Sequence, residues 1–166
     1  MKAFLFSLLL LLSLNLWSQK TVDDVLALYN TRSIPYISVE ETRMLQLDQK
    51  VLLLDARELK EFEVSKLPGA QYVGFSEFDS QEVADQIENK DQPIIVYCSL
   101  GVRSEEIGEK LKKAGFTQVK NLYGGIIEWK NNGYPVLDSE NQNTEEVHTF
   151  SQYWGKWLKK GKKVYK

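Results

Sequence analysis

Two short apolar runs constrain the fold of this 166-residue chain more than any other feature. The first is Val51-Leu52-Leu53-Leu54, which ends in Asp55, and the second covers residues 94–97 and ends directly before Cys98. Each run is uninterrupted and too short for a helix, which is typical of a strand buried on both faces. Strands of this kind belong to parallel sheets.

Amphipathic patterns alternate with these runs along the chain. Thr21 and Ser38 are the expected caps of the first two helices. Further strands are expected at 34–37, 71–73 and 118–122, and helical segments at 21–30, from Ser38, 57–64, 80–89, 103–114 and after Gly124-Gly125. This alternation predicts an α/β fold, with a parallel central sheet flanked by helices on both faces.

The N-terminal residues 1–19 are predicted to be a signal peptide. Lys2 is their one charge, and leucine and phenylalanine dominate the remainder up to the expected cleavage point near Ser18. An uncleaved membrane anchor is the alternative, although Asn15 and the serines weaken a permanent span. Both interpretations place the domain in the periplasm or outside the cell. Without residues 1–19, 20 basic and 23 acidic side chains remain, a net charge of −3 that suits a soluble domain.

The predicted domain covers residues 20–137, and the polar residues 138–148 are interpreted as a linker. Residues 149–166 form a basic, aromatic tail, with six lysines and no acid around Tyr153, Trp154 and Trp157. Three interpretations of the tail stay open: a helix that packs on the domain, a contact with an anionic membrane surface, or a docking site for a protein partner. Nucleic acid is not an expected partner of an exported, acidic protein.

Cys98 is the only cysteine, so no disulfide can form within the chain. It stands at the carboxyl end of a predicted parallel strand, where ligands bind in α/β sheets. The amides of the following loop are expected to surround the sulfur at a helix N-terminus, with Arg103 adding positive charge. Both effects favour the nucleophilic thiolate. Cys98 is therefore the predicted nucleophile, and the candidate binding residues are Ser99, Leu100, Gly101, Val102, Arg103 and Ser104.

Five motifs in order resemble the rhodanese-like domain, a sulfurtransferase module, over about residues 36–137. They are Leu53-Leu54-Asp55-Ala56-Arg57-Glu58, Glu61-Phe62, Leu67-Pro68-Gly69-Ala70, the Cys98–Ser104 loop, and Leu122-Tyr123-Gly124-Gly125 with Trp129. The chain departs from the family at Lys66, where a histidine often stands. That position does not carry sulfur, so the resemblance is hardly weakened.

The resemblance implies that the Cys98 thiolate takes a sulfane sulfur from a donor such as thiosulfate and passes it to a thiol or cyanide-like acceptor. This chemistry needs no metal or organic cofactor. Asp55 and Arg57 either support the loop from behind or form a structural ion pair, and the two roles are compatible. The only histidine, His148, lies in the predicted linker, so a protease-type cysteine–histidine dyad is not expected.

Two other functions are weighed against an exported sulfurtransferase. A non-catalytic or persulfide-carrier module that docks to a protein partner stays open. A cysteine phosphatase or arsenate reductase is disfavoured, because four residues separate Cys98 from Arg103 where such loops carry five. Ser99 and Leu100 add no charge to the loop, so a small organic thiol or a protein persulfide is as good a donor as dianionic thiosulfate.

Overall fold

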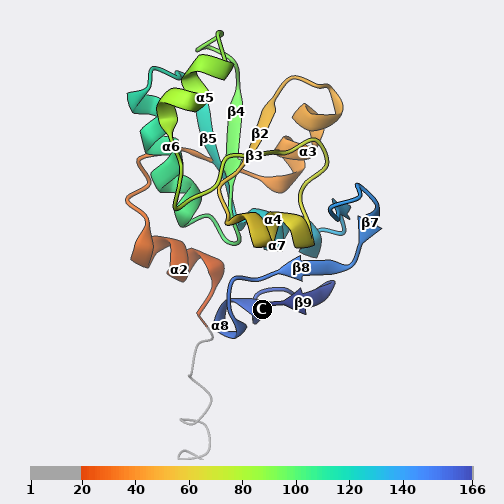
Figure 1. Ribbon diagram of the computed structural model, residues 1–166. Helices are drawn as coiled ribbons and strands as arrows, with labels where there is room; N and C mark the ends of the chain where they lie inside the picture. The colour runs from red at the N-terminus through yellow and green to blue at the C-terminus, as the bar shows by residue number, and fades with distance from the viewer. Residues whose placement is uncertain (1–19, 166) are drawn as a thin grey trace, which may run out of the picture.

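The structure is a computed structural model that describes residues 20–165, and the predicted signal peptide lies outside them. Its centre is a five-stranded parallel sheet with the order β1-β5-β4-β2-β3 (Figure 1). The strands are β1 (Tyr36–Ile37), β2 (Leu52–Asp55), β3 (Gln71–Tyr72), β4 (Ile94–Tyr97) and β5 (Val119–Leu122). The two apolar runs thus form neighbouring strands, with Leu54 paired to Val96. The predicted fold class is confirmed.

Helices cover both faces of this sheet because side chains alternate along each strand. Leu53 and Ile95 face one core cluster, which includes residues of α2 (Val22–Tyr29), α3 (Val39–Leu47) and α7 (Gly125–Asn131). Leu54 and Val96 face the other cluster, under α5 (Ser80–Gln86) and α6 (Arg103–Lys113). The short helix α4 (Leu59–Val64) follows β2.

Helices α2 and α3 begin where the sequence predicts. Thr21 and Ser38 each accept a hydrogen bond from the backbone N–H three residues later, at 3.2 Å and 3.1 Å. The backbone N–H of Thr21 donates in turn to the Asp24 carboxylate and that of Ser38 to the Glu41 carboxylate, which completes two capping boxes. Both N-cap predictions are confirmed.

The C-terminal part of the chain is more ordered than the sequence analysis expects. The predicted linker contains β7 (Asn143–Thr144), which pairs with β6 (Val136–Leu137), and β8 (Glu146–His148). Within the predicted tail, α8 (Gln152–Gly155) is one turn, and β9 (Lys162–Val164) pairs in parallel with β8. We call residues 146–164 the C-terminal segment. Trp157 and Leu158 are buried in the first core cluster, in agreement with the packing interpretation of the tail.

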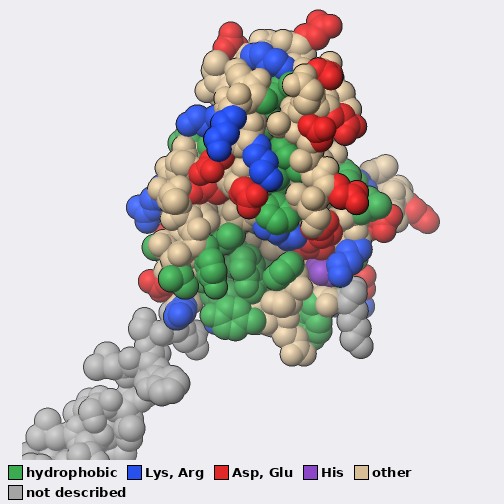
Figure 2. Space-filling view, turned by 60° about the vertical axis from the view of Figure 1, so that its left-hand side comes forward, with side chains coloured by type: hydrophobic (Ala, Val, Ile, Leu, Met, Phe, Trp, Pro, Cys, Tyr) green, Lys and Arg blue, Asp and Glu red, His purple; other side chains and the backbone are tan. Residues whose placement is uncertain are grey.

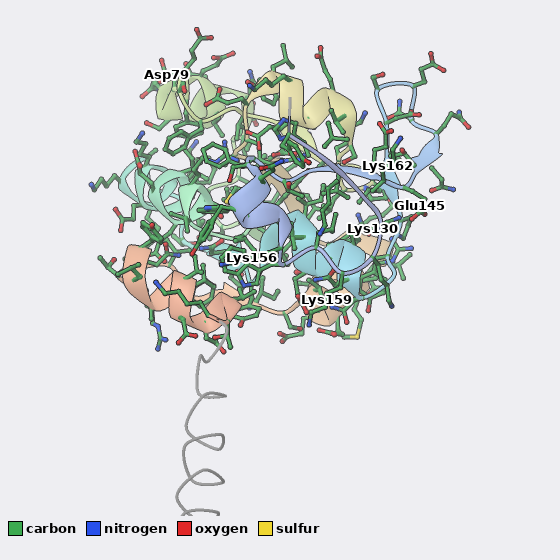
Figure 3. All side chains as sticks on the ribbon, turned by 90° about the horizontal axis from the view of Figure 1, so that it is seen from below. Asp79, Lys130, Glu145, Lys156, Lys159 and Lys162 are labelled. Atoms are coloured by element: carbon green, nitrogen blue, oxygen red, sulfur yellow. The ribbon has the colours of Figure 1, made fainter. Side chains whose placement is uncertain are left out.

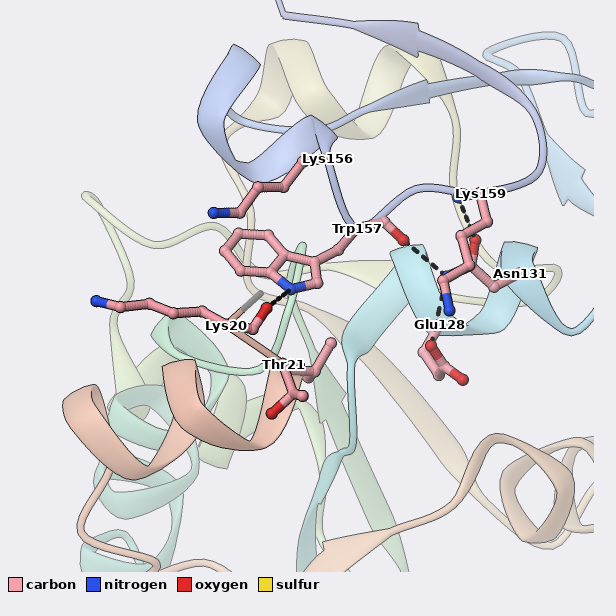
Figure 4. A pocket seen from close by; sticks show the side chains of 8 residues that line it. Lys20, Thr21, Glu128, Asn131, Lys156, Trp157 and Lys159 are labelled. Carbon is pink, nitrogen blue, oxygen red and sulfur yellow. Dashed lines mark hydrogen bonds between the residues drawn. The ribbon is translucent and has the colours of Figure 1, made fainter. Parts of the chain in front are cut away.

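Polar contacts fasten this segment to the rest of the domain. Seen from below, Lys130 of α7 lies beside Glu145, the residue directly before this segment, with 2.9 Å between Nζ and Oε1 (Figure 3). Asn131 Nδ2 donates to the Trp157 carbonyl at 2.9 Å, and Trp157 Nε1 donates to the Lys20 carbonyl at 3.2 Å (Figure 4). Lys20, Asn131 and Trp157 border a cavity of about 560 Å³, and none of its lining residues belongs to the Cys98 loop.

Candidate active site

Cys98 directly follows β4, at the carboxyl edge of the sheet, and α6 begins five residues later at Arg103. Between them, Gly101 adopts a left-handed backbone with φ of +113°, which a side chain would strain. A Cβ atom at Gly101 would also lie 3.4 Å from the Leu122 carbonyl oxygen. The glycine therefore lets the chain turn tightly beside the neighbouring strand and back towards the sulfur.

The structure gives the sulfur two hydrogen-bond donors. Gly101 N–H donates to Cys98 Sγ at 3.1 Å, and the Ser104 hydroxyl lies 3.5 Å from Sγ. Ser104 has one proton for two acceptors, because its Oγ is also 2.8 Å from Asn121 Oδ1. Gly101 is thus the firmer donor. Of the amides from Ser99 to Arg103 that the sequence analysis places around the sulfur, it is the one with a hydrogen bond to Sγ.

These groups decide the protonation of Cys98. Burial alone raises the pKa of the thiol, but the positive charge of Arg103 and the hydrogen bonds from Ser104 and Gly101 outweigh it. The pKa of Cys98 therefore lies below the ordinary value for a cysteine. The lowered pKa favours the thiolate, which is the nucleophilic form of cysteine.

The loop is braced from the side of α7. Gly125 has a φ of +55°, and its amide neighbours Ile126 and Ile127 donate to the carbonyls of Cys98 and Ser99 at 3.0 Å and 3.3 Å. A Cβ atom at Gly125 would lie only 2.3 Å from the Cys98 carbonyl oxygen. The second glycine of the Gly124-Gly125 pair is thus needed for direct contact with the cysteine loop.

Arg103 is held by a carboxylate that the sequence analysis did not assign to the site. Its Nη1 and Nη2 donate to the two carboxylate oxygens of Glu61, at 2.6 Å and 2.9 Å. Ser99 Oγ joins them, 3.1 Å from Arg103 Nη2 and 3.2 Å from Glu61 Oε1. Glu61 stands in the first turn of α4 and is buried. The sequence signal for Glu61 is its place in the Glu61-Phe62 motif, three residues after Glu58.

His148 also reaches this ion pair, from β8. Its Nδ1 lies 3.5 Å from Glu61 Oε1 and accepts the Phe150 N–H at 3.1 Å. A nitrogen that accepts a proton cannot also donate one, so the shorter contact assigns Nδ1 as an acceptor and leaves Glu61 to Arg103. Burial raises the pKa of Glu61, and the His148 and Arg103 contacts hold it well below its usual range. We ascribe this lowering to Arg103, whose two bonds do not depend on the imidazole proton.

Asp55 and Arg57 form a separate ion pair behind the loop. Both side chains are fully buried, and Arg57 donates to Asp55 through Nη2 at 2.6 Å and through Nε at 2.9 Å. Burial opposes the charge of Arg57, but the Asp55 carboxylate keeps the pKa of the guanidinium above its usual value. Arg57 Nη2 also donates to the Ser65 carbonyl, after α4. These contacts are those of a structural ion pair, and none of them reaches residues 98–104.

The fold and this site define a class: an α/β domain that presents one low-pKa cysteine in a loop between a central strand and a helix. Residues 38–132, more than half of the chain, match the family described as the Rhodanese-like domain. The chain belongs to the rhodanese-like family.

Several relatives have names that describe sulfur chemistry. The chain is 33% identical over 101 residues to the "Putative sulfur carrier protein YrkF" of Bacillus subtilis, covering 60% of this chain and 53% of the relative. It is 34% identical over 89 residues to the "Probable adenylyltransferase/sulfurtransferase MoeZ" of Mycobacterium tuberculosis, covering 54% and 22%. The chain thus spans about half of the first relative and less of the second.

A solved structure gives the same picture. The thiosulfate sulfurtransferase from Pseudomonas aeruginosa superposes with a TM-score of 0.60 and 26% sequence identity. The similarity covers 76% of this chain and 24% of that protein. The architecture of the sheet and its helices is therefore shared with a sulfurtransferase.

Proposed function

We propose that this chain is an exported sulfurtransferase that carries sulfane sulfur on Cys98. The thiolate attacks the outer sulfur of a donor, the S–S bond of the donor breaks, and the donor leaves with that electron pair, as sulfite does from thiosulfate. The Cys98 persulfide then gives its outer sulfur to a thiol or to cyanide, which becomes thiocyanate, and the Cys98 thiolate is regenerated. No outside oxidant or reductant enters these two steps.

The observation that carries this proposal is the environment of Cys98 Sγ. A lowered pKa supplies the nucleophile, and the Gly101 N–H at 3.1 Å is a donor suited to an anionic sulfur. The names of the relatives support the same chemistry. The identities of the sulfur donor and of the sulfur acceptor are part of this proposal.

A carrier role is the second candidate, and one observation favours it. Cys98 is fully buried, which would slow turnover with small molecules and protect a stored persulfide. A protein partner would then open the site and receive the sulfur. The similarity to a putative sulfur carrier fits this alternative.

Intact-mass spectrometry tests both candidates. The purified domain, incubated with thiosulfate or 3-mercaptopyruvate, should gain about 32 Da, the mass of one sulfur atom on the cysteine. Cyanide should remove that mass, and Cys98→Ser should never gain it. Rapid release of thiocyanate identifies the enzyme, whereas stable loading without turnover identifies the carrier. Hydrolysis of phenyl phosphates without a sulfur adduct would contradict both.

Export is a separate part of the proposal. Among residues 20–165 there is no helix with the length and apolar character needed to cross a membrane. Cell fractionation followed by N-terminal sequencing tests whether residues 1–19 are removed. A mature N-terminus near Lys20 in the periplasm or medium supports a cleaved signal peptide, and a full-length chain in the membrane fraction supports the anchor.

A further inference from the structure

The C-terminal segment forms part of the wall of the candidate site. Phe150 directly follows the buried pair His148 and Thr149, and its ring centroid lies 4.9 Å from the Arg103 guanidinium carbon. Hydrophobic side chains gather on the lower part of the surface turned to the viewer in Figure 2. An arginine beneath an aromatic face is stabilised by a cation–π interaction, and the ring keeps other groups away from that side of the cation.

The guanidinium of Arg103 is already paired with a carboxylate. Glu61 takes both guanidinium nitrogens, and Ser99 Oγ shares one of them. The other loop side chains between Cys98 and Arg103 carry no charge. An incoming anion therefore meets a thiolate beside an arginine that is already paired with Glu61. To use Arg103 it must displace Glu61 or one of two aromatic rings, Phe150 or Phe75, the latter with its centroid 5.9 Å from the guanidinium carbon.

Glu61 and Phe150 differ in how readily they can move. Glu61 is 1% exposed, and its displacement would leave a buried carboxylate without its partner. Phe150 is 50% exposed and has a φ of +66°, a backbone conformation that is strained for a residue with a side chain. Because Cys98 itself is fully buried, some side chain must move before a donor reaches it. Phe75 packs against the second core cluster, whereas the half-exposed Phe150 contacts Trp154 with 5.6 Å between ring centroids, so Phe150 is the neighbour of Arg103 that moves with the smallest loss of contacts.

We propose that Phe150 is a specificity-determining residue, which favours persulfide donors that react in their protonated form R–S–SH and disfavours dianionic thiosulfate. This inference rests on the proposed sulfur transfer through Cys98. With a donor R–S–SH, the Cys98 thiolate attacks the outer sulfur, the S–S bond of the donor breaks, and R–S⁻ leaves. The new persulfide on Cys98 then loses its proton to solvent. In this protonated form the donor brings no charge that Arg103 would have to neutralise.

Paired alkylating reagents test the proposal without any sulfur transfer. Neutral iodoacetamide and anionic iodoacetate both react with the single cysteine of the full chain, and intact mass gives the two rates. Replacing Phe150 by alanine should uncover Arg103 and raise the iodoacetate-to-iodoacetamide rate ratio by about threefold or more, the scale of an exposed cation–π contact. The matched control is Tyr153→Ala, since Tyr153 is 53% exposed on the same segment and pairs with Trp157.

The proposal predicts that the ratio rises in Phe150→Ala and stays at the wild-type value in Tyr153→Ala. Equal ratios in all three proteins, or equal rises in both variants, would overturn it. Phe150→Leu, which keeps an apolar side chain but removes the ring face, should also raise the ratio and serves if the alanine variant is unstable. A protein that shows the shift in alkylation but never gains sulfur would refute the proposed function and leave the role of Phe150 intact.

Discussion

Arg103 and Glu61, 42 residues apart in the chain, share two hydrogen bonds that join the start of α6 to α4. Both partners are largely removed from water, so loss of one leaves the other charge buried. Glu61→Gln should lower the free energy of unfolding by about 3 kcal/mol, measured by urea denaturation. Glu63→Gln, an exposed position on the same helix, is the control and should change little. Equal losses in both variants would contradict the structural weight given to this pair.

The same pair predicts how stability depends on acid. The pKa of Glu61 is lower in the folded protein than in the unfolded chain, so its contribution is complete above the unfolded value of about 4.3. As the pH falls below that value towards the folded pKa, the contribution is lost. The stability difference between wild type and Glu61→Gln should therefore shrink in acid. A difference that is constant from neutral pH into strong acid would argue against a charged Glu61.

The reactivity of Cys98 should persist below the pH at which free cysteine loses its nucleophilicity. Its pKa is lowered in the fold, so the midpoint of the alkylation rate against pH should lie below that of a free cysteine measured under the same conditions. Ser104→Ala removes a donor at 3.5 Å from Sγ and should move the midpoint upwards. Ser99→Ala is the matched control, because the Ser99 hydroxyl bonds to Arg103 and Glu61. A larger upward move in the control would reverse the roles given to the two serines.

Alanine substitutions at two glycines with positive φ distinguish the effect of a steric clash from the effect of backbone strain alone. Gly125→Ala places a Cβ atom 2.3 Å from the Cys98 carbonyl oxygen and should lower stability by about 2–4 kcal/mol, with slower Cys98 alkylation. Gly115→Ala meets nothing within 4 Å at a φ of +97°, so only strain of about 1 kcal/mol is expected. Thermal unfolding and alkylation rates measure both. The idea of bracing through α7 fails if Gly125→Ala behaves like Gly115→Ala.

Replacement of Arg57 separates the two roles that its sequence position allows. Arg57→Met leaves Asp55 buried without a partner and should lower stability by about 3–5 kcal/mol. Because none of the described hydrogen bonds of Arg57 reaches residues 98–104, the pH midpoint of Cys98 alkylation should not change. Lys60→Met, at an exposed position of α4, is the control for stability. A shifted midpoint in folded Arg57→Met would instead assign Arg57 to loop support.

The central sheet could be predicted from sequence because β2 and β4 are buried on both faces and their apolar residues are contiguous. Caps and glycines marked the helix ends by local chemistry. The C-terminal strands gave no such signal, since β9 begins with two lysines and pairs with β8 through the backbone. His148 and Phe150 were missed for the same reason. Only the fold brings them, from a polar stretch, to a loop some fifty residues earlier in the chain.

The bond from the Trp157 indole to the Lys20 carbonyl has a mechanical meaning. Trp157 belongs to the segment that places Phe150 over Arg103. This hydrogen bond therefore links Lys20, just before α2, to the segment that covers Arg103. Because Trp157 is also part of the first core cluster, a pull on the chain at Lys20 would act on the C-terminal segment and on the core together. An attachment of the domain at that point would thus be transmitted through the Trp157 indole towards Phe150 and Arg103.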